Sequence, residues 1–149
     1  MTKHNKIIII HITYPILYNN MVRIMSLNLY AAWIAFLLGC IAGAIPGIFF
    51  YNANWLGGYS SWKRRMIRLA HISFFGIGAL NLAFALTVYI LELKSGLMPV
   101  SYLLIIGVIT MPIICYLSAW NIFFRHLFFI PAISVVFGIT LFVWRILFI

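Results

Sequence analysis

Four long apolar runs constrain the fold of this chain more than any other feature. They cover about residues 29–50, 67–91, 97–120 and 123–149. Each run reaches the roughly 20 apolar residues that a helix needs to cross a bilayer. None shows the alternation typical of a barrel strand, and only helices or closed barrels satisfy their backbone hydrogen bonds in lipid. Because short connections join antiparallel neighbours, the sequence predicts an all-α integral membrane protein, an up-down four-helix transmembrane bundle with short loops and an N-terminal tail.

The composition agrees with a chain that is solvated mainly by lipid. Of its residues, 66% are hydrophobic and 7% are charged, whereas about a quarter of a soluble domain is charged. We expect a single transmembrane domain over residues 27–149 and a disordered or interfacial tail over residues 1–26. A start site misassigned upstream of Met21 or Met25 is the alternative explanation of that tail.

The basic residues cluster at the start of the second run. The cluster consists of Lys63, Arg64, Arg65 and Arg68. Lys and Arg divide five against five between the two sides, so the density of this cluster decides, and we expect it to be cytoplasmic with both termini outside. Anionic lipid headgroups are its expected partners, at about 1 kcal/mol per basic residue near the surface. Nucleic acid is not expected despite the net charge of +9, because the remaining basic residues are scattered rather than gathered on one face.

Small residues mark the helix faces that can approach closely. Gly39, Gly43 and Gly47 recur every four residues in the first run, and Gly78 lies in the second. Helices in lipid associate through such close contact rather than through a hydrophobic drive, so we expect packing within the bundle. A docking face for a second protein is the alternative.

The chain lacks the groups that most catalysis requires. Glu92 is its only acidic residue, which excludes paired-carboxylate chemistry and a Ser-His-Asp triad within the chain. Cys40 and Cys115 lack metal-binding or redox spacing and are expected to be free. The sequence therefore predicts that this chain alone is not an enzyme.

The histidines His71 and His126 suggest the most specific chemistry. Counted from the starts of the second and fourth runs, they should lie at similar depth near the same membrane face. Each has an arginine close by, Arg68 or Arg125. Two such imidazoles could serve as axial ligands of a haem b iron, with the arginines near its propionates. The alternatives are interfacial side chains without a cofactor, which is the leading expectation, or contact with a quinone or a lipid headgroup. Asn81 lies on a different face of the second run and should contact a different neighbour.

The leading hypothesis is a non-catalytic accessory or anchor subunit of a larger membrane complex, with other membrane-protein subunits as partners. A haem b electron-transfer subunit and a small transporter are the alternatives. The general plan, with histidines near helix ends, resembles small four-helix membrane subunits of respiratory complexes, some of which carry haem b. This resemblance is architectural and assigns no residue.

Overall fold

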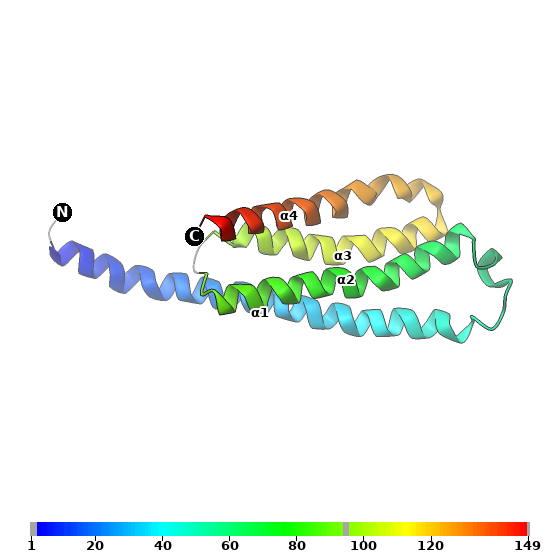
Figure 1. Ribbon diagram of the computed structural model, residues 1–149, viewed down its shortest axis with the longest axis horizontal. Coiled ribbons are helices and arrows are strands. Elements are labelled where there is room, and N and C mark those ends of the chain that lie inside the picture. The colour runs from blue at the N-terminus through cyan, green and yellow to red at the C-terminus, as the bar shows by residue number, and fades with distance from the viewer. Residues whose placement is uncertain (1–2, 94–95, 149) are drawn as a thin grey trace.

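The computed structural model describes the backbone of residues 3–93 and 96–148, and the side chains in these ranges from Tyr18 onward apart from Asn20. Four long helices follow in order, with two short 3-10 segments before the second and fourth: α1 (Lys3–Ile48), η1 (Trp55–Gly57), α2 (Trp62–Ile90), α3 (Met98–Trp120), η2 (Ile122–Phe128) and α4 (Phe129–Leu147) (Figure 1). Four helical stretches are long and apolar enough to cross a membrane: Met21–Ile48, Trp62–Ile90, Met98–Trp120 and Ile122–Leu147. The prediction of an all-α four-helix membrane bundle is confirmed.

The first helix is longer than the first apolar run. α1 spans 46 residues, or about 68 Å at 1.5 Å per residue. Its beginning projects past the ends of the other three helices (Figure 1). Residues 3–26, for which we expected a disordered or interfacial tail, belong to this helix. Extending an existing helix costs far less than nucleating a new one, and the membrane-spanning part supplies the nucleus.

Two other boundaries differ from the predicted ones for local reasons. α2 begins at Trp62 rather than at residue 67, because the Ser61 side chain caps it by accepting a hydrogen bond from the Arg64 N–H at 3.3 Å. The basic cluster thus lies on the first turns of a helix. The fourth run starts as the 3-10 segment η2 and becomes α-helical only at Phe129, two residues before Pro131. Proline has no N–H and disfavours α-helical geometry in the residue before it, so it belongs near a helix start.

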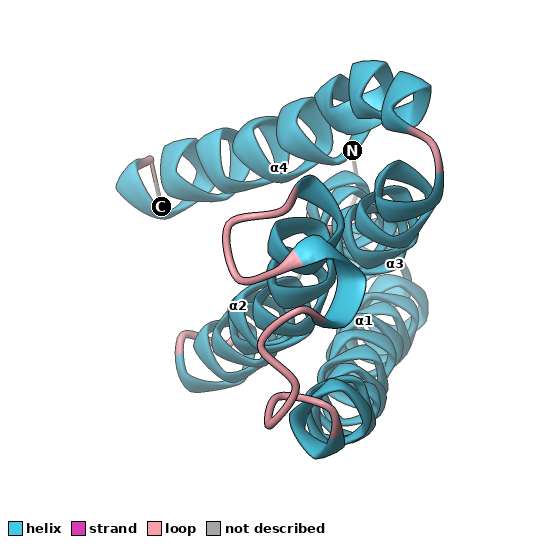
Figure 2. Ribbon diagram, turned by 90° about the vertical axis from the view of Figure 1, so that its right-hand side faces the viewer, coloured by secondary structure: helices cyan, strands magenta, loops and turns pink. Residues whose placement is uncertain are grey.

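The four helices form an open arrangement rather than a closed square. α2 and α3 lie in the middle, with α1 packed on α2 and, less extensively, on α3 (Figure 2). α4 packs on α3, and within the described ranges none of its Cα atoms comes within 8 Å of α1 or α2. Only longer side chains bridge α2 and α4, as where the Phe84 and Phe142 rings meet at 4.8 Å between centroids. The outer faces of α1 and α4 are therefore left to the surroundings.

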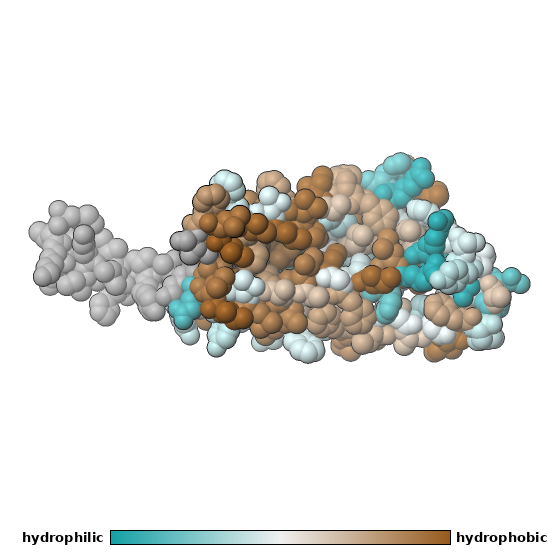
Figure 3. Space-filling view, viewed as in Figure 1, coloured by the Kyte–Doolittle hydropathy of each residue, from teal (hydrophilic) through white to brown (hydrophobic). Residues whose placement is uncertain are grey.

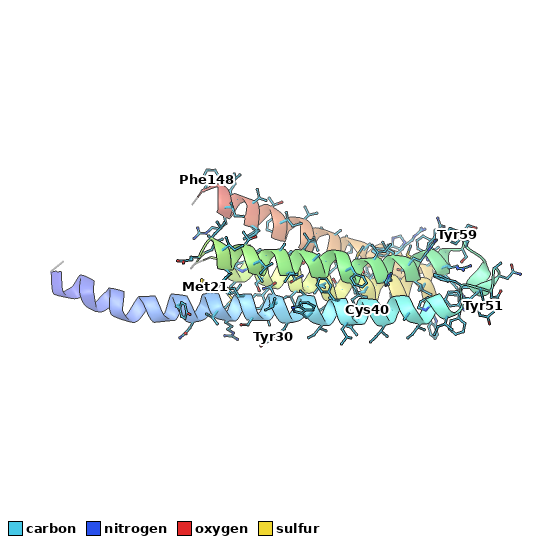
Figure 4. All side chains as sticks on the ribbon, turned by 60° about the horizontal axis from the view of Figure 1, so that its bottom comes forward. Met21, Tyr30, Cys40, Tyr51, Tyr59 and Phe148 are labelled. Carbon is cyan, nitrogen blue, oxygen red and sulfur yellow. The ribbon has the colours of Figure 1, made fainter. Side chains whose placement is uncertain are left out.

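The two ends of the bundle differ in polarity. We call the end that carries residues 49–61 and η2 the loop end, and the opposite one the terminal end. Hydrophilic side chains gather at the loop end, and brown apolar side chains cover most of the visible body of the bundle (Figure 3). Tyr51 and Tyr59 lie at the loop end, whereas Met21 and Phe148 lie at the terminal end (Figure 4). This distribution matches a bundle whose middle faces lipid.

Buried polar side chains link the three helices that pack most closely. Asn28 of α1 is fully buried and its Nδ2 donates to the Ser101 hydroxyl on α3. Asn81 of α2, also fully buried, donates from Nδ2 to the Leu104 carbonyl on α3 at 3.3 Å. Such bonds contribute about 0.6–2 kcal/mol each between membrane helices. Asn81 thus contacts α3, whereas His71 contacts α1, which confirms that they occupy different faces of α2.

Candidate functional site

Arg64 is the member of the basic cluster whose side chain is buried within the fold. It is only 5% exposed, and its guanidinium carbon lies 5.1 Å from the centroid of the Phe50 ring and 5.7 Å from that of the Trp55 ring. Its Nη1 donates a hydrogen bond to the Ala53 carbonyl at 3.2 Å. Cation–π attraction and this bond fold residues 49–61 over the start of α2. The Arg64 side chain therefore stabilises the fold of the chain itself. It is not available to the lipid headgroups that were expected to bind it.

The other three basic side chains remain accessible. Lys63 and Arg65 are exposed, and Arg65 lies over the Trp62 ring at 5.8 Å. Arg68 is half-buried; it stacks on the Tyr59 ring at 4.1 Å and its Nη2 donates to the Tyr59 carbonyl at 3.2 Å.

Among the described residues no side-chain carboxylate lies near these charges. Glu92, the only acidic residue, follows the far end of α2, more than about 30 Å from Arg68 along the helix axis. The positive charge at the loop end must therefore be balanced from outside the chain.

His71 joins α2 to α1. Its Nδ1 lies 2.9 Å from the Gly39 carbonyl oxygen; because a carbonyl only accepts, Nδ1 carries the proton in this bond. The ring also packs edge-on against Phe75, with centroids 5.3 Å apart. A Cβ at Gly43 would lie 2.4 Å from Cε1 of the imidazole, so only glycine admits the ring here. In its neutral form the imidazole keeps a lone pair on Nε2.

A cavity opens beside His71 and Arg68 at the seam between α1 and α2. Its volume is about 220 Å³. We call it the seam cavity, and its lining consists of Ala42, Gly43, Pro46, Phe50, Ile67, Arg68, His71 and Ile72. Arg68 and His71 are the two lining residues with polar side chains. The cavity thus combines one permanent positive charge and one imidazole with apolar walls.

His126 and Arg125 lie elsewhere. Both are exposed on η2, where His126 packs against Phe123 at 5.9 Å between ring centroids. η2 packs on α3 and α4 and, in the described part of the chain, not on α2. The structure does not bring His71 and His126 together, because α4 begins after His126 and does not pack beside α2. Among the described residues no group of three or more His, Cys, Asp or Glu side chains could hold a metal ion.

The glycines of the predicted packing stripe differ in how closely other side chains approach them. A Cβ at Gly39 would lie 2.7 Å from the Phe75 ring, and one at Gly78 would lie 3.0 Å from the Phe36 ring. Together with Gly43, these glycines allow α1 and α2 to approach within the chain. Nothing lies within 4 Å of a Cβ built on Gly47, so this glycine does not serve that packing.

A groove between α1 and α3 is the feature that the sequence did not indicate. Its volume is about 360 Å³. The lining is apolar and comes from three helices: Leu27, Tyr30, Ala31, Ile34, Ala35 and Leu38 of α1, Phe74 of α2, and Ile105, Val108, Ile109, Pro112 and Ile113 of α3. Alternating small and large residues on α1 were the available signal, but they became meaningful only once α3 was placed opposite.

Cys40, which is exposed, and Cys115, which is buried, are both free as predicted.

No protein-family model, curated protein or solved structure matches the chain. Its class follows from its own features, which are those of a multi-pass membrane protein with four candidate spans.

Proposed function

We propose that the chain is a non-catalytic accessory or anchor subunit of a larger membrane complex, and that the groove between α1 and α3 receives an apolar transmembrane helix of a partner subunit. The shape of this groove is the observation that carries the proposal. Near the terminal end, Asn28 and Ser101 hold α1 and α3 together. Farther toward the loop end the groove opens between these helices, with Phe74 of α2 among its lining residues.

The dimensions and chemistry of the groove suit a helix. Its α1 wall runs from Leu27 to Leu38, about 16 Å along the axis or some three turns. Ala31, a small and partly exposed residue in the α1 wall, permits the close backbone approach on which helix association in lipid depends. The position of α4 supports the same proposal, because among the described residues α4 packs on α3 without contacting α1 and no other helix covers the groove.

Mild-detergent extraction of the full chain from its native membranes tests this proposal. The mass of the extracted particle is measured for the unaltered chain, for Ala31→Trp, which fills the groove, and for Ile133→Trp on the outer face of α4, where Ile133 is 62% exposed. The proposal predicts a complex heavier than the chain that Ala31→Trp reduces and Ile133→Trp preserves. A monodisperse single chain in all three preparations contradicts it.

The orientation remains part of the proposal. We place the loop end, with Lys63, Arg65 and Arg68, on the cytoplasmic side, where anionic headgroups balance its charge. The predicted count across the two sides also used Lys94 and the side chains of Lys3 and Lys6, which lie outside the described residues. The arrangement of the two histidines gives no support to the haem b alternative, because His71 contacts α1 and His126 lies on η2.

A further inference from the structure

We propose that the seam cavity binds an anionic phospholipid through its phosphate, which Arg68 and His71 hold between α1 and α2. This inference does not depend on a partner subunit. The headgroup is thus expected at Arg68 and His71 in the seam cavity, and not over the whole basic cluster.

The electrostatic argument begins with Arg68. A guanidinium has five N–H donors, and one is used on the Tyr59 carbonyl. Through this bond the side chain reaches back toward the loop end, where headgroups lie. The chain supplies no acid there, because Glu92 is beyond the opposite end of α2. An arginine in apolar surroundings without a carboxylate is suited to a phosphate, which its planar fork binds through two parallel hydrogen bonds.

His71 makes the site selective among phosphates. Its Nδ1–H is committed to the Gly39 carbonyl, so in its neutral form the ring offers a lone pair at Nε2 that can accept a hydrogen bond. A phosphomonoester monoanion carries both a P–OH, which can donate to Nε2, and charged oxygens, which Arg68 can bind. A phosphodiester has the charged oxygens but no P–OH. The geometry therefore favours phosphatidic acid over phosphatidylglycerol, and either over zwitterionic phosphatidylcholine.

The rest of the cavity is suited to the lipid chains. Ala42 and Pro46 on α1 face Ile67 and Ile72 on α2 across a space lined by apolar side chains. Arg68 and His71 lie about 9 and 13 Å along the axis from the start of α2. A phosphate held by them would therefore lie near the loop end, and the acyl chains would extend from it toward the bilayer centre. A water-soluble phosphate would leave these apolar walls unused.

Lipid binding to the purified full chain tests the proposal. Native mass spectrometry in detergent measures the apparent Kd of phosphatidic acid, phosphatidylglycerol and phosphatidylcholine with matched acyl chains, and of inorganic phosphate. Arg68→Gln and His71→Phe remove the two polar groups of the cavity. Arg65→Gln removes an equal charge that is exposed over Trp62 and does not line the cavity.

We expect Arg68→Gln to weaken phosphatidic acid binding at least tenfold and Arg65→Gln to weaken it less than twofold. His71→Phe should abolish the preference for phosphatidic acid over phosphatidylglycerol. Equal losses in the two arginine variants would show diffuse attraction and overturn the site. Binding of inorganic phosphate as tightly as the lipid would overturn the lipid assignment, and a preference unchanged by His71→Phe would overturn the role of the imidazole.

A second measurement covers the case in which a variant does not fold. Phosphatidic acid with a photoreactive group on its acyl chain is irradiated with the unaltered protein, and the modified peptides are mapped. Adducts concentrated at Ala42 and Ile72 support the cavity. Adducts spread evenly over the lipid-facing surface of all four helices contradict it.

Discussion

Replacing Gly43 by alanine should destabilise the protein, although alanine is the better helix former. The added Cβ would lie 2.4 Å from Cε1 of His71, so the ring must withdraw by about 1 Å to reach ordinary contact. That movement stretches its 2.9 Å bond to the Gly39 carbonyl beyond hydrogen-bonding distance. Overpacking costs about 1–3 kcal/mol, and the lost interhelical bond costs about 0.6–1.7 kcal/mol. After subtracting about 1 kcal/mol for helix propensity, a net loss of about 1–4 kcal/mol remains.

Two other glycines provide matched controls for this substitution. Nothing lies within 4 Å of a Cβ built on Gly47, four residues along the same stripe, or on Gly76 in the middle of α2. Alanine at either position should leave the free energy of unfolding unchanged or raise it by up to about 1 kcal/mol. The measurement is unfolding by sodium dodecyl sulfate titrated into mild-detergent micelles, followed by circular dichroism.

The contact with His71 can be isolated by a double-mutant cycle. In a His71→Ala background the obstructing ring is absent, so Gly43→Ala should cost at least about 1 kcal/mol less than it does in the unaltered chain. Equal effects of alanine at Gly43, Gly47 and Gly76 would refute the reasoning, and so would a Gly43→Ala cost that persists without the imidazole.

Three further predictions follow from burial. Arg64→Met should lower the free energy of unfolding by about 2–4 kcal/mol and open the adjoining loop to protease, because it removes cation–π contacts and a charged hydrogen bond; Arg65→Met should change it by less than about 0.5 kcal/mol, and an equal effect of the two contradicts the assigned role. Asn81→Leu should change the free energy of unfolding by no more than about 1 kcal/mol, because the buried Oδ1 has no partner among the described residues. Asn81→Asp should lower it by several kcal/mol, because it buries a charge. Similar thermal midpoints for the two variants would contradict this prediction. In detergent, N-ethylmaleimide should modify exposed Cys40 at least tenfold faster than buried Cys115. Mass mapping of the adducts measures both rates, and faster modification of Cys115 would contradict this prediction.

The transmembrane class could be predicted from the sequence because it depends on local properties. Helix length, apolar composition and small residues such as Gly39 and Gly78 are visible in one segment at a time. The separate faces of His71 and Asn81 followed from helical periodicity alone, and the structure places them against α1 and α3.

The remaining features depend on which helices meet. Matching His71 with His126 assumed that the second and fourth helices are neighbours, but in the described part of the chain α4 packs on α3 and not on α2. It also assumed that the fourth run is helical from Phe123, whereas α4 begins at Phe129. Similarly, the four residues of the basic cluster look equivalent in sequence. Only the fold of residues 49–61 shows that Arg64 is buried among aromatic rings while Arg68 lines a cavity.

Site-specific photo-crosslinking in native membranes tests the proposed subunit role most directly. A photoreactive amino acid is placed at Ile34 or Ile109 in the groove, and at Val136, which is 64% exposed on α4 and outside the groove. We expect one discrete protein adduct of the same mass increment from both groove positions, no such adduct from Val136, and loss of the adduct when Ala31→Trp fills the groove. Adducts with lipid alone at the groove positions, or the same protein adduct from Val136, would contradict a partner helix between α1 and α3.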